Sequence, residues 1–237
     1  MIQIAAMRRI GVAVSLVLAA VLSIVWVVLR PVADGSPAGQ LAAIADAPGL
    51  ATASTAAFVL AQLPFLLAAL GIAHFIADRA PVLATIGASL AVLGGFGHAV
   101  FGGVQLVQVG MAADTANVEV YAGLLAGALP WPLMVMMLAG TVGTALGLLF
   151  FGIGLMRAKA GPRWVPYTLW GFILVEFVGT GLTSWASLAS GLLYLASFAA
   201  LAVAVWRSPL ALWMSGTAVA RIEATRTHGR KSVPDRV

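Results

Sequence analysis

The chain has 237 residues, of which 62% are hydrophobic and only 9% are charged, and its net charge is +5. Soluble domains contain about 25% charged and about 45–50% apolar residues, so a core of this size could not hide so much apolar surface from water. The composition excludes a soluble globular protein and predicts an all-α, polytopic transmembrane helical bundle. The sequence contains no cysteine, which excludes disulfides, thiolate metal ligands and cysteine nucleophiles within it.

The hydropathy pattern predicts six membrane spans, each with roughly the 20 apolar residues that cross about 30 Å of hydrocarbon. These spans are expected at about 10–30, 51–76, 82–110, 120–156, 165–184 and 187–206. The fourth is too long for one upright crossing, so we expect it to be kinked or to begin as an interfacial segment over 118–129, broken at Pro130 and Pro132. The loop after the first span is expected to be partly helical over 39–46.

The charges predict the orientation of these spans. If the N-terminus is cytoplasmic, all of the 13 basic residues except Arg30 lie in cytoplasmic segments. The outer loops then carry four acidic residues: Asp34, Asp46, Asp114 and Glu119. Because lysine and arginine are enriched in cytoplasmic loops, both termini are predicted to be cytoplasmic. The alanine, glycine and valine bias is typical of high-GC bacteria, so the predicted location is the bacterial inner membrane.

The two ends of the chain need separate interpretation. Arg8 and Arg9 precede the first span as in a signal peptide, but its apolar run exceeds the 7–15 residues of such a segment, so an uncleaved span is expected. Residues 208–237 form a basic tail after a transmembrane domain of residues 1–207. Two alternatives stay open for the tail: an amphipathic helix over 209–224 with Trp213 near the headgroups, or a disordered segment.

Glycine is frequent in the third span, which reads LAVLGGFGHAVFGGVQLVQVG. Gly95, Ala99 and Gly103 recur every four residues, so they share one helix face and predict close packing of another helix. No strand precedes these glycines, which argues against a phosphate-binding loop.

Glu176 lies within the apolar run FILVEFVGTG of the fifth span. A charged carboxylate near the bilayer centre costs at least about 2.5–3.5 kcal/mol, so Glu176 is expected to face the bundle interior. Thr180 and Thr183 follow at helical spacing and are expected to extend a polar stripe outward. Thr141 and Thr144 give the fourth span a mildly polar face that the carboxylate could meet.

His98 lies in the outer half of the third span, at a depth about 9 Å above Glu176 if the helices are upright. Gln105 shares nearly the same face, and Gln62 of the second span lies at a matching depth, so a cluster of these three side chains is expected. His74 lies about 18 Å from His98 along the membrane normal, which excludes one haem held by both histidines.

These polar residues have two interpretations. The first is an intramembrane pocket for a small solute, a proton or a cation, with the candidate lining Glu176, Thr180, Thr183, His98, Gln62 and Gln105. The second is structural, with a neutral glutamic acid and a neutral histidine joining helices by hydrogen bonds. Neither interpretation requires a catalytic residue, a metal or a cofactor, and none is predicted.

Three functions follow from these interpretations. The first is a binding or transport protein, and the second is an accessory membrane subunit that packs through the glycine-rich face. The third, an enzyme acting on lipid substrates, lacks a motif such as HxxxH or DDxxD. The expected partners are membrane lipids and other membrane subunits or a second copy of the chain. Nucleic acid is not expected, because no interleaved aromatic and basic pattern is present.

One segment carries a family resemblance. In GLMRAKAGPRWVPYTLWGF, residues 154 to 172, a basic turn ends in Pro162-Arg163-Trp164 and leads into an aromatic-rich span. With the six spans and the Ala- and Asp-rich first outer loop, this layout resembles a family of small bacterial integral-membrane proteins of unknown function. The resemblance implies a six-span fold and no particular activity.

Overall fold

The computed structural model describes residues 2–183 and 185–214, and this part of the chain is helical with no strand. Five of its helices are long and apolar enough to cross a membrane: α1 (Ile2–Leu29), α3 (Pro48–Ile76), α4 (Pro81–Ala113), α6 (Trp131–Ala158) and α8 (Trp185–Arg207). The all-helical prediction is therefore confirmed. The predicted span at 165–184 is not among the five, because α7 (Val165–Phe177) has only 13 residues before the 3-10 turn η1 (Gly179–Gly181).

One predicted boundary differs from the structure. Helix α1 begins at Ile2, so Arg8 and Arg9 lie within it and do not precede it. The segment predicted over 120–156 is two helices, α5 (Val118–Ala126) and α6, divided at 127–130, which agrees with the break expected between an initial segment over 118–129 and the two prolines. Proline stands in the first turn of α6, where its missing N–H interrupts no helical hydrogen bond, as it also does in α2 (Pro37–Asp46), α3, α4 and α7.

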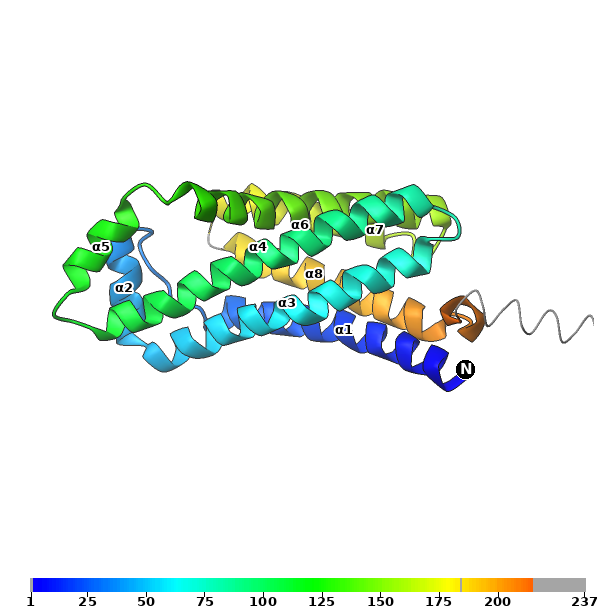
Figure 1. Cartoon of the computed structure of the whole chain (residues 1–237), viewed down its shortest axis with the longest axis horizontal. Helices are drawn as coiled ribbons and strands as arrows, with labels where there is room; N and C mark the ends of the chain where they lie inside the picture. Colours follow the sequence, from blue (N-terminus) through cyan, green and yellow to red (C-terminus); the bar gives the residue numbers. More distant parts are fainter. Residues whose placement is uncertain (1, 184, 215–237) are drawn as a thin grey trace, which may run out of the picture.

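The long helices and α7 form a closed ring in which each helix contacts the next: α1, α3, α4, α6, α7, α8 and again α1. Figure 1 shows these helices running along the long axis of the molecule, with the short helices α2 and α5 together at one end. The helix expected over 39–46 is present as α2, whose N-cap Ser36 accepts a hydrogen bond from the Gly39 N–H at 3.0 Å.

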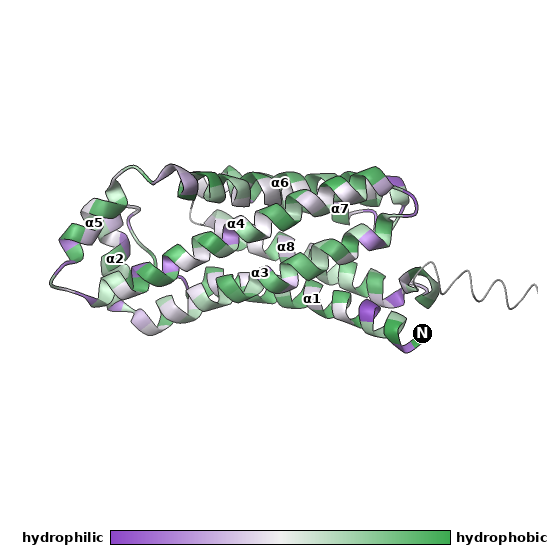
Figure 2. Ribbon diagram, viewed as in Figure 1, coloured by the Kyte–Doolittle hydropathy of each residue, from purple (hydrophilic) through white to green (hydrophobic). Residues whose placement is uncertain are grey.

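Charge divides the two ends of the ring. Among the described residues, all basic side chains except Arg30 lie at the end where α1 begins and α8 ends, which we call the basic end. The opposite end, the acidic end, carries α2, α5 and four acidic residues: Asp34, Asp46, Asp114 and Glu119. Between the ends the ribbons are mainly apolar (Figure 2).

The outward faces of the helices are also apolar. On α3, Leu60, Leu63, Leu67 and Leu70 recur at helical spacing and all are exposed. A soluble protein rarely exposes such continuous apolar surface. The exposed leucines, together with the five long apolar helices, indicate a membrane protein.

The closest helix pairing in the ring joins α4 to α6 through glycines. A Cβ atom added at Gly143 would lie 2.7 Å from the backbone N of Gly94 and from the carbonyl O of Leu90. Gly97 and Gly140 meet in the same way one turn further on. The two backbones therefore touch, and a side chain at any of these four glycines would separate them.

The predicted glycine track does not form this contact. Gly95 faces Leu66 of α3, and no atom lies within 4 Å of a Cβ added at Gly103, while Ala99 is half-buried. Of the predicted track, Gly95 packs closely against α3 and Gly103 does not pack against another helix. Helix α4 lies between two neighbours, so its small residues are divided between α3 and α6. Spacing along one helix does not reveal that division.

The basic end is closed by the segment after α8. Trp213 in the 3-10 turn η2 (Leu210–Trp213) is 2% exposed, and its Nε1–H donates to Ser208 Oγ at 2.7 Å. Arg9 Nη1 donates to the Ser208 carbonyl at 2.9 Å. Trp213 is therefore buried against the bundle, with its indole N–H bonded to an internal partner, and its position near the headgroups stays a prediction. Only 209–214 of the helix suggested for 209–224 is described, and the rest of the tail lies outside the described residues.

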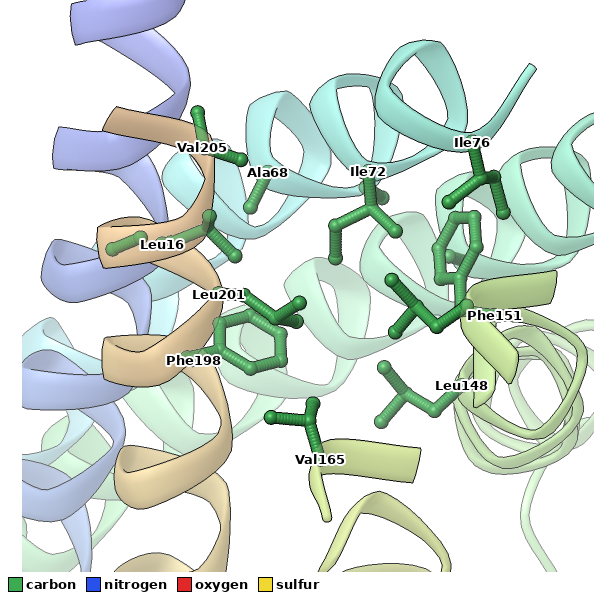
Figure 3. Packing of buried hydrophobic residues seen from close by; sticks show 14 of the residues in the cluster. Leu16, Ala68, Ile72, Ile76, Leu148, Phe151, Val165, Phe198, Leu201 and Val205 are labelled. Carbon is green, nitrogen blue, oxygen red and sulfur yellow. The ribbon is translucent and has the colours of Figure 1, made fainter. Parts of the chain in front are cut away.

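Figure 3 shows the core between the ring helices near the basic end, which we call the packed half. Leu16, Ile72, Phe151, Phe198 and Leu201 come from four different helices and are each 2% exposed or less. Their side chains meet at the centre of the ring. The packed half therefore leaves no route through the centre of the bundle at this level.

Candidate binding cavity

A cavity of about 260 Å³ lies inside the ring, in the half of the bundle nearer the acidic end, which we call the hollow half. Each of the ring helices α1, α3, α4, α6, α7 and α8 contributes to its lining. An engineered apolar cavity of about 150 Å³ holds benzene, so this volume fits a molecule of about ten non-hydrogen atoms.

Glu176 reaches this cavity from the last turn of α7. It stands four residues after Phe172, so both side chains lie on one helix face and both line the cavity. Ser190 Oγ of α8 donates a hydrogen bond to Glu176 Oε2. Within residues 2–183 and 185–214, no basic side chain forms an ion pair with this carboxylate, and its Oε1 has no hydrogen bond from a protein group.

His98 faces the same cavity from α4. Its Nδ1 lies 3.4 Å from Thr144 Oγ1 of α6, and its ring meets the edge of Phe58 with the centroids 5.8 Å apart. The glycine contact between α4 and α6 explains this position, because Gly140 packs directly against the His98 backbone. The imidazole is thus held between two helices with its remaining surface toward the cavity.

Gln62 lines the cavity from α3 and is 8% exposed. Its Nε2 donates to the carbonyl of Phe58, one turn earlier, at 2.8 Å. This bond uses an amide donor and leaves the Gln62 carbonyl oxygen as an acceptor for a bound molecule.

Three of the six predicted site residues therefore line one cavity: Glu176, His98 and Gln62. The sequence predicted about 9 Å of depth between the carboxylate and the imidazole, but the structure places them near one level. The reason is that Val165, where α7 begins, already lies inside the packed half at 1% exposure. Ser190 and His98 both lie about 25 Å along their helices from the basic end. Glu176 is bonded to Ser190 and is therefore near the level of His98.

The other three predicted residues do not line the cavity. Helix α7 ends at Phe177, and the following Gly-Thr-Gly sequence forms η1, so the expected polar stripe is broken. Thr180 donates instead to the Glu176 carbonyl, and Thr183 is exposed. Glycine has low helix propensity, which accounts for the early end of α7. Gln105 lies two turns beyond His98 on α4, above the cavity, and its Oε1 is buried without a hydrogen-bond partner among the described residues.

Aromatic side chains recur around the cavity wall, which the sequence did not predict. Trp26 pairs with Phe58 at a centroid distance of 4.8 Å, and Phe58 meets Phe101 edge to face at 5.9 Å. On the opposite side, Phe172 of α7 and Tyr194 of α8 have centroids 5.0 Å apart. These rings come from five helices, so only their convergence in the ring identifies them as one wall.

Tyr194 and Ser190 are further lining residues that the sequence interpretation missed. They stand four residues apart on α8, and this spacing inside an apolar helix was the available signal. Tyr194 is 6% exposed, and no protein group in the described part of the chain hydrogen-bonds its hydroxyl. A buried hydroxyl normally has a partner, so this group is available to a molecule in the cavity.

No protein-family model matches this chain, and no curated protein or solved structure matches it significantly. The resemblance to small bacterial six-span proteins therefore stays a prediction, and the function is argued from the cavity alone.

Proposed function

We propose that this protein is an integral membrane protein that binds a small solute in the cavity within its helical ring. The observation that supports it best is that Glu176 and His98 line the same cavity. A glutamate placed only for stability would be expected to pack without adjoining space. Here Glu176 lines a volume large enough for a small molecule, and among the described residues only its Oε2 accepts a side-chain hydrogen bond.

The cavity and the packed half together favour access from the acidic end. Aliphatic and aromatic side chains fill the centre of the ring toward the basic end. A solute would therefore enter from the side of α2 and α5. A carrier with one closed side and one accessible side has this arrangement, so the proposed function extends to transport by alternating access.

We further propose that α7 and η1 together form a sixth crossing, antiparallel to α8, and that both termini are cytoplasmic. The apolar segment from Val165 to Gly181 is 17 residues long, or about 26 Å if helical. The proposed location is the bacterial inner membrane, with the basic end in the cytoplasm, in keeping with the distribution of lysine and arginine.

Because the chain has no cysteine, single cysteines can test both proposals. Ala61 and Ala68 lie on the same face of α3, seven residues apart, the first in the cavity wall and the second in the packed half at 0% exposure. A membrane-impermeant thiol reagent is expected to modify Ala61→Cys from the acidic side and to leave Ala68→Cys unmodified. Equal labelling of the two variants, or no labelling of Ala61→Cys, would contradict an accessible cavity.

The orientation is tested by the exposed positions Asp46 and Lys159, which lie at opposite ends. In right-side-out vesicles the reagent is expected to modify Asp46→Cys at once and Lys159→Cys only after the membrane is opened. The reverse order would overturn the proposed topology while leaving the cavity unaffected.

The accessory-subunit alternative is less well supported by the packing. The glycines at positions 94, 97, 140 and 143 are already used between α4 and α6. They are therefore not available to an external helix unless the bundle opens. Gly103 has free space around it, but one open glycine does not define an interface.

A further inference from the structure

The cavity wall combines many aromatic rings with a single carboxylate, and this combination defines the chemistry of a ligand. Aromatic faces carry negative electrostatic potential and attract cations, most strongly when water is excluded. A ligand with an apolar cationic group satisfies both the rings and Glu176. We propose that the cavity binds a small alkylated ammonium cation, an inference that rests on the proposed solute-binding function.

Glu176 provides the charge that this ligand needs. Its Oε2 accepts a hydrogen bond from Ser190, which fixes the carboxylate, and its Oε1 has no protein donor in the described part of the chain. An anionic ligand would meet this carboxylate, and no arginine or lysine is among the described residues that line the cavity. Arg30 lies over the Trp26 ring at 5.4 Å from its centroid, outside that lining. The site therefore discriminates against anions.

The aromatic rings provide the surface that an alkylated ammonium group needs. Trp26, Phe58 and Phe101 form one wall, and Phe172 and Tyr194 form the wall that carries Glu176. Besides the carboxylate and the Gln62 carbonyl, the acceptors that line the cavity are neutral, and hydroxyls such as those of Ser23 and Thr141 already donate to helix carbonyls. A strongly hydrated metal ion or a polyol would lose more water contacts here than the wall replaces, whereas a trimethylammonium group presents only methyl groups.

The size of the cavity limits the ligand further. About ten non-hydrogen atoms fit, which accommodates choline but not a whole phospholipid. A phospholipid headgroup would also bring its phosphate close to the carboxylate, so we assign the site to a free cation and not to a lipid headgroup.

The test uses the full chain in nanodiscs of phosphatidylglycerol, which contain no ammonium group, with binding measured by isothermal titration calorimetry. The probes are choline, 3,3-dimethylbutan-1-ol, which has the same shape without the charge, and glycerophosphocholine, which adds a phosphate. Choline is expected to bind at least about tenfold more tightly than either of the others. About 1.4 kcal/mol of cation–π attraction in a site without water corresponds to a tenfold difference in affinity.

Variants then locate the interaction. Glu176→Gln keeps the size and the hydrogen bond of the side chain, and it is expected to weaken choline binding about tenfold or more while the alcohol is unaffected. Trp26→Leu is expected to weaken choline binding about threefold to thirtyfold, in line with the loss of one cation–π contact. Glu119→Gln, which removes an acidic residue outside the cavity, is expected to change nothing.

The outcomes separate the two proposals. Equal binding of choline and the neutral alcohol would overturn the cation assignment and retain the solute-binding function. Tighter binding of glycerophosphocholine would overturn the assignment to a free cation. If no probe binds, the cation assignment fails, and labelling of Ala61→Cys decides whether the accessible cavity fails with it.

Discussion

The packed half and the hollow half are built from the same helices, yet one is filled and the other contains a cavity. In the packed half, side chains such as Leu16, Ile72 and Leu201 from different helices fill the centre of the ring. In the hollow half, aromatic rings pair along the walls, as Trp26 does with Phe58, and leave the centre open. Rings that pair with one another in tilted or edge-to-face geometry cover a wall without filling the space in front of it.

The two halves also differ in how their polar side chains are hydrogen-bonded. In the packed half, Ser197 Oγ donates to Thr168 Oγ1 at 2.8 Å and both residues remain within the helix contact. In the hollow half, Glu176, Gln62 and Tyr194 each retain hydrogen-bonding capacity toward the cavity. Unused capacity beside an empty volume is the feature expected of a ligand site, whereas complete pairing is the feature expected of a structural one.

The largest difference in stability between the two halves is expected when one large aromatic ring is removed from each. Phe198→Ala, at 0% exposure in the packed half, is expected to destabilise the protein by about 3–5 kcal/mol, because the cavity it leaves has no counterpart in the native fold. Phe101→Ala, whose ring already borders the cavity, is expected to cost less than half as much. Chemical or thermal unfolding in detergent micelles measures both, and equal losses would contradict the division into two halves.

The glycine contact between α4 and α6 lies beside His98 in the cavity wall. Substitution at this contact is expected to cause the next largest loss of stability. Gly143→Ala places a methyl group 2.7 Å from backbone atoms of α4, which cannot move aside as a side chain can. We expect a loss of about 1–3 kcal/mol from this overpacking.

Gly103→Ala is the matched control, since it adds the same methyl group to α4 where nothing lies within 4 Å. It is expected to be neutral or slightly stabilising, because alanine favours a helix more than glycine does. A Gly103→Ala variant as unstable as Gly143→Ala would show that the close helix contact is not the cause.

The closure of the packed half at the basic end is tested by Trp213→Phe. Phenylalanine retains most of the apolar contact and removes the N–H that donates to Ser208 Oγ at 2.7 Å, so a loss of about 1 kcal/mol is expected. Trp164→Phe, at a tryptophan that is 47% exposed, is expected to leave the unfolding transition unchanged. A larger effect at Trp164 than at Trp213 would argue against a buried turn that closes the bundle.

The smallest expected effect lies at the acidic end, outside the cavity. Asn117 Nδ2 and the Tyr121 hydroxyl both donate to Asp114 Oδ2 at 2.9 Å, and these bonds lower the pKa of Asp114 below its usual value of 3.8. Because the folded pKa is depressed, the contribution to stability is present above pH 3.8 and is lost as the pH falls through the lower folded value. Asp114→Asn is expected to remove this acid dependence.

The ionisation of Tyr121 also reports on its hydrogen bond to Asp114. The Asp114 carboxylate raises the pKa of Tyr121 above its usual value of 10.0, first through the hydrogen bond and then through its charge. Ultraviolet titration is expected to show this tyrosine ionising at lower pH in Asp114→Asn than in the original protein, with Tyr121→Phe identifying its signal. An unchanged titration would show that the hydrogen bond at the acidic end is not maintained in solution.

The sequence by itself determined that this is a membrane protein and that its apolar segments are helices. Hydrophobic runs of about 20 residues have one stable solution in lipid, the helix, because no other local structure satisfies every backbone group within one segment. Pro130 and Pro132 also located the break that precedes α6. The sequence also indicated that Glu176 faces the interior, since the cost of a carboxylate facing lipid is high.

Only the tertiary structure decided which side chains share a cavity. The sequence spacing predicted Thr180 and Thr183 beside Glu176, but the end of α7 removed them, and Ser190 of α8 took their place. The aromatic wall could not be predicted either, because nothing in the sequence distinguishes Trp26, Phe58 and Tyr194 from the other apolar residues of their helices. Periodicity specifies which face of one helix is buried, but the rotation and depth of six helices relative to one another are set by packing between them.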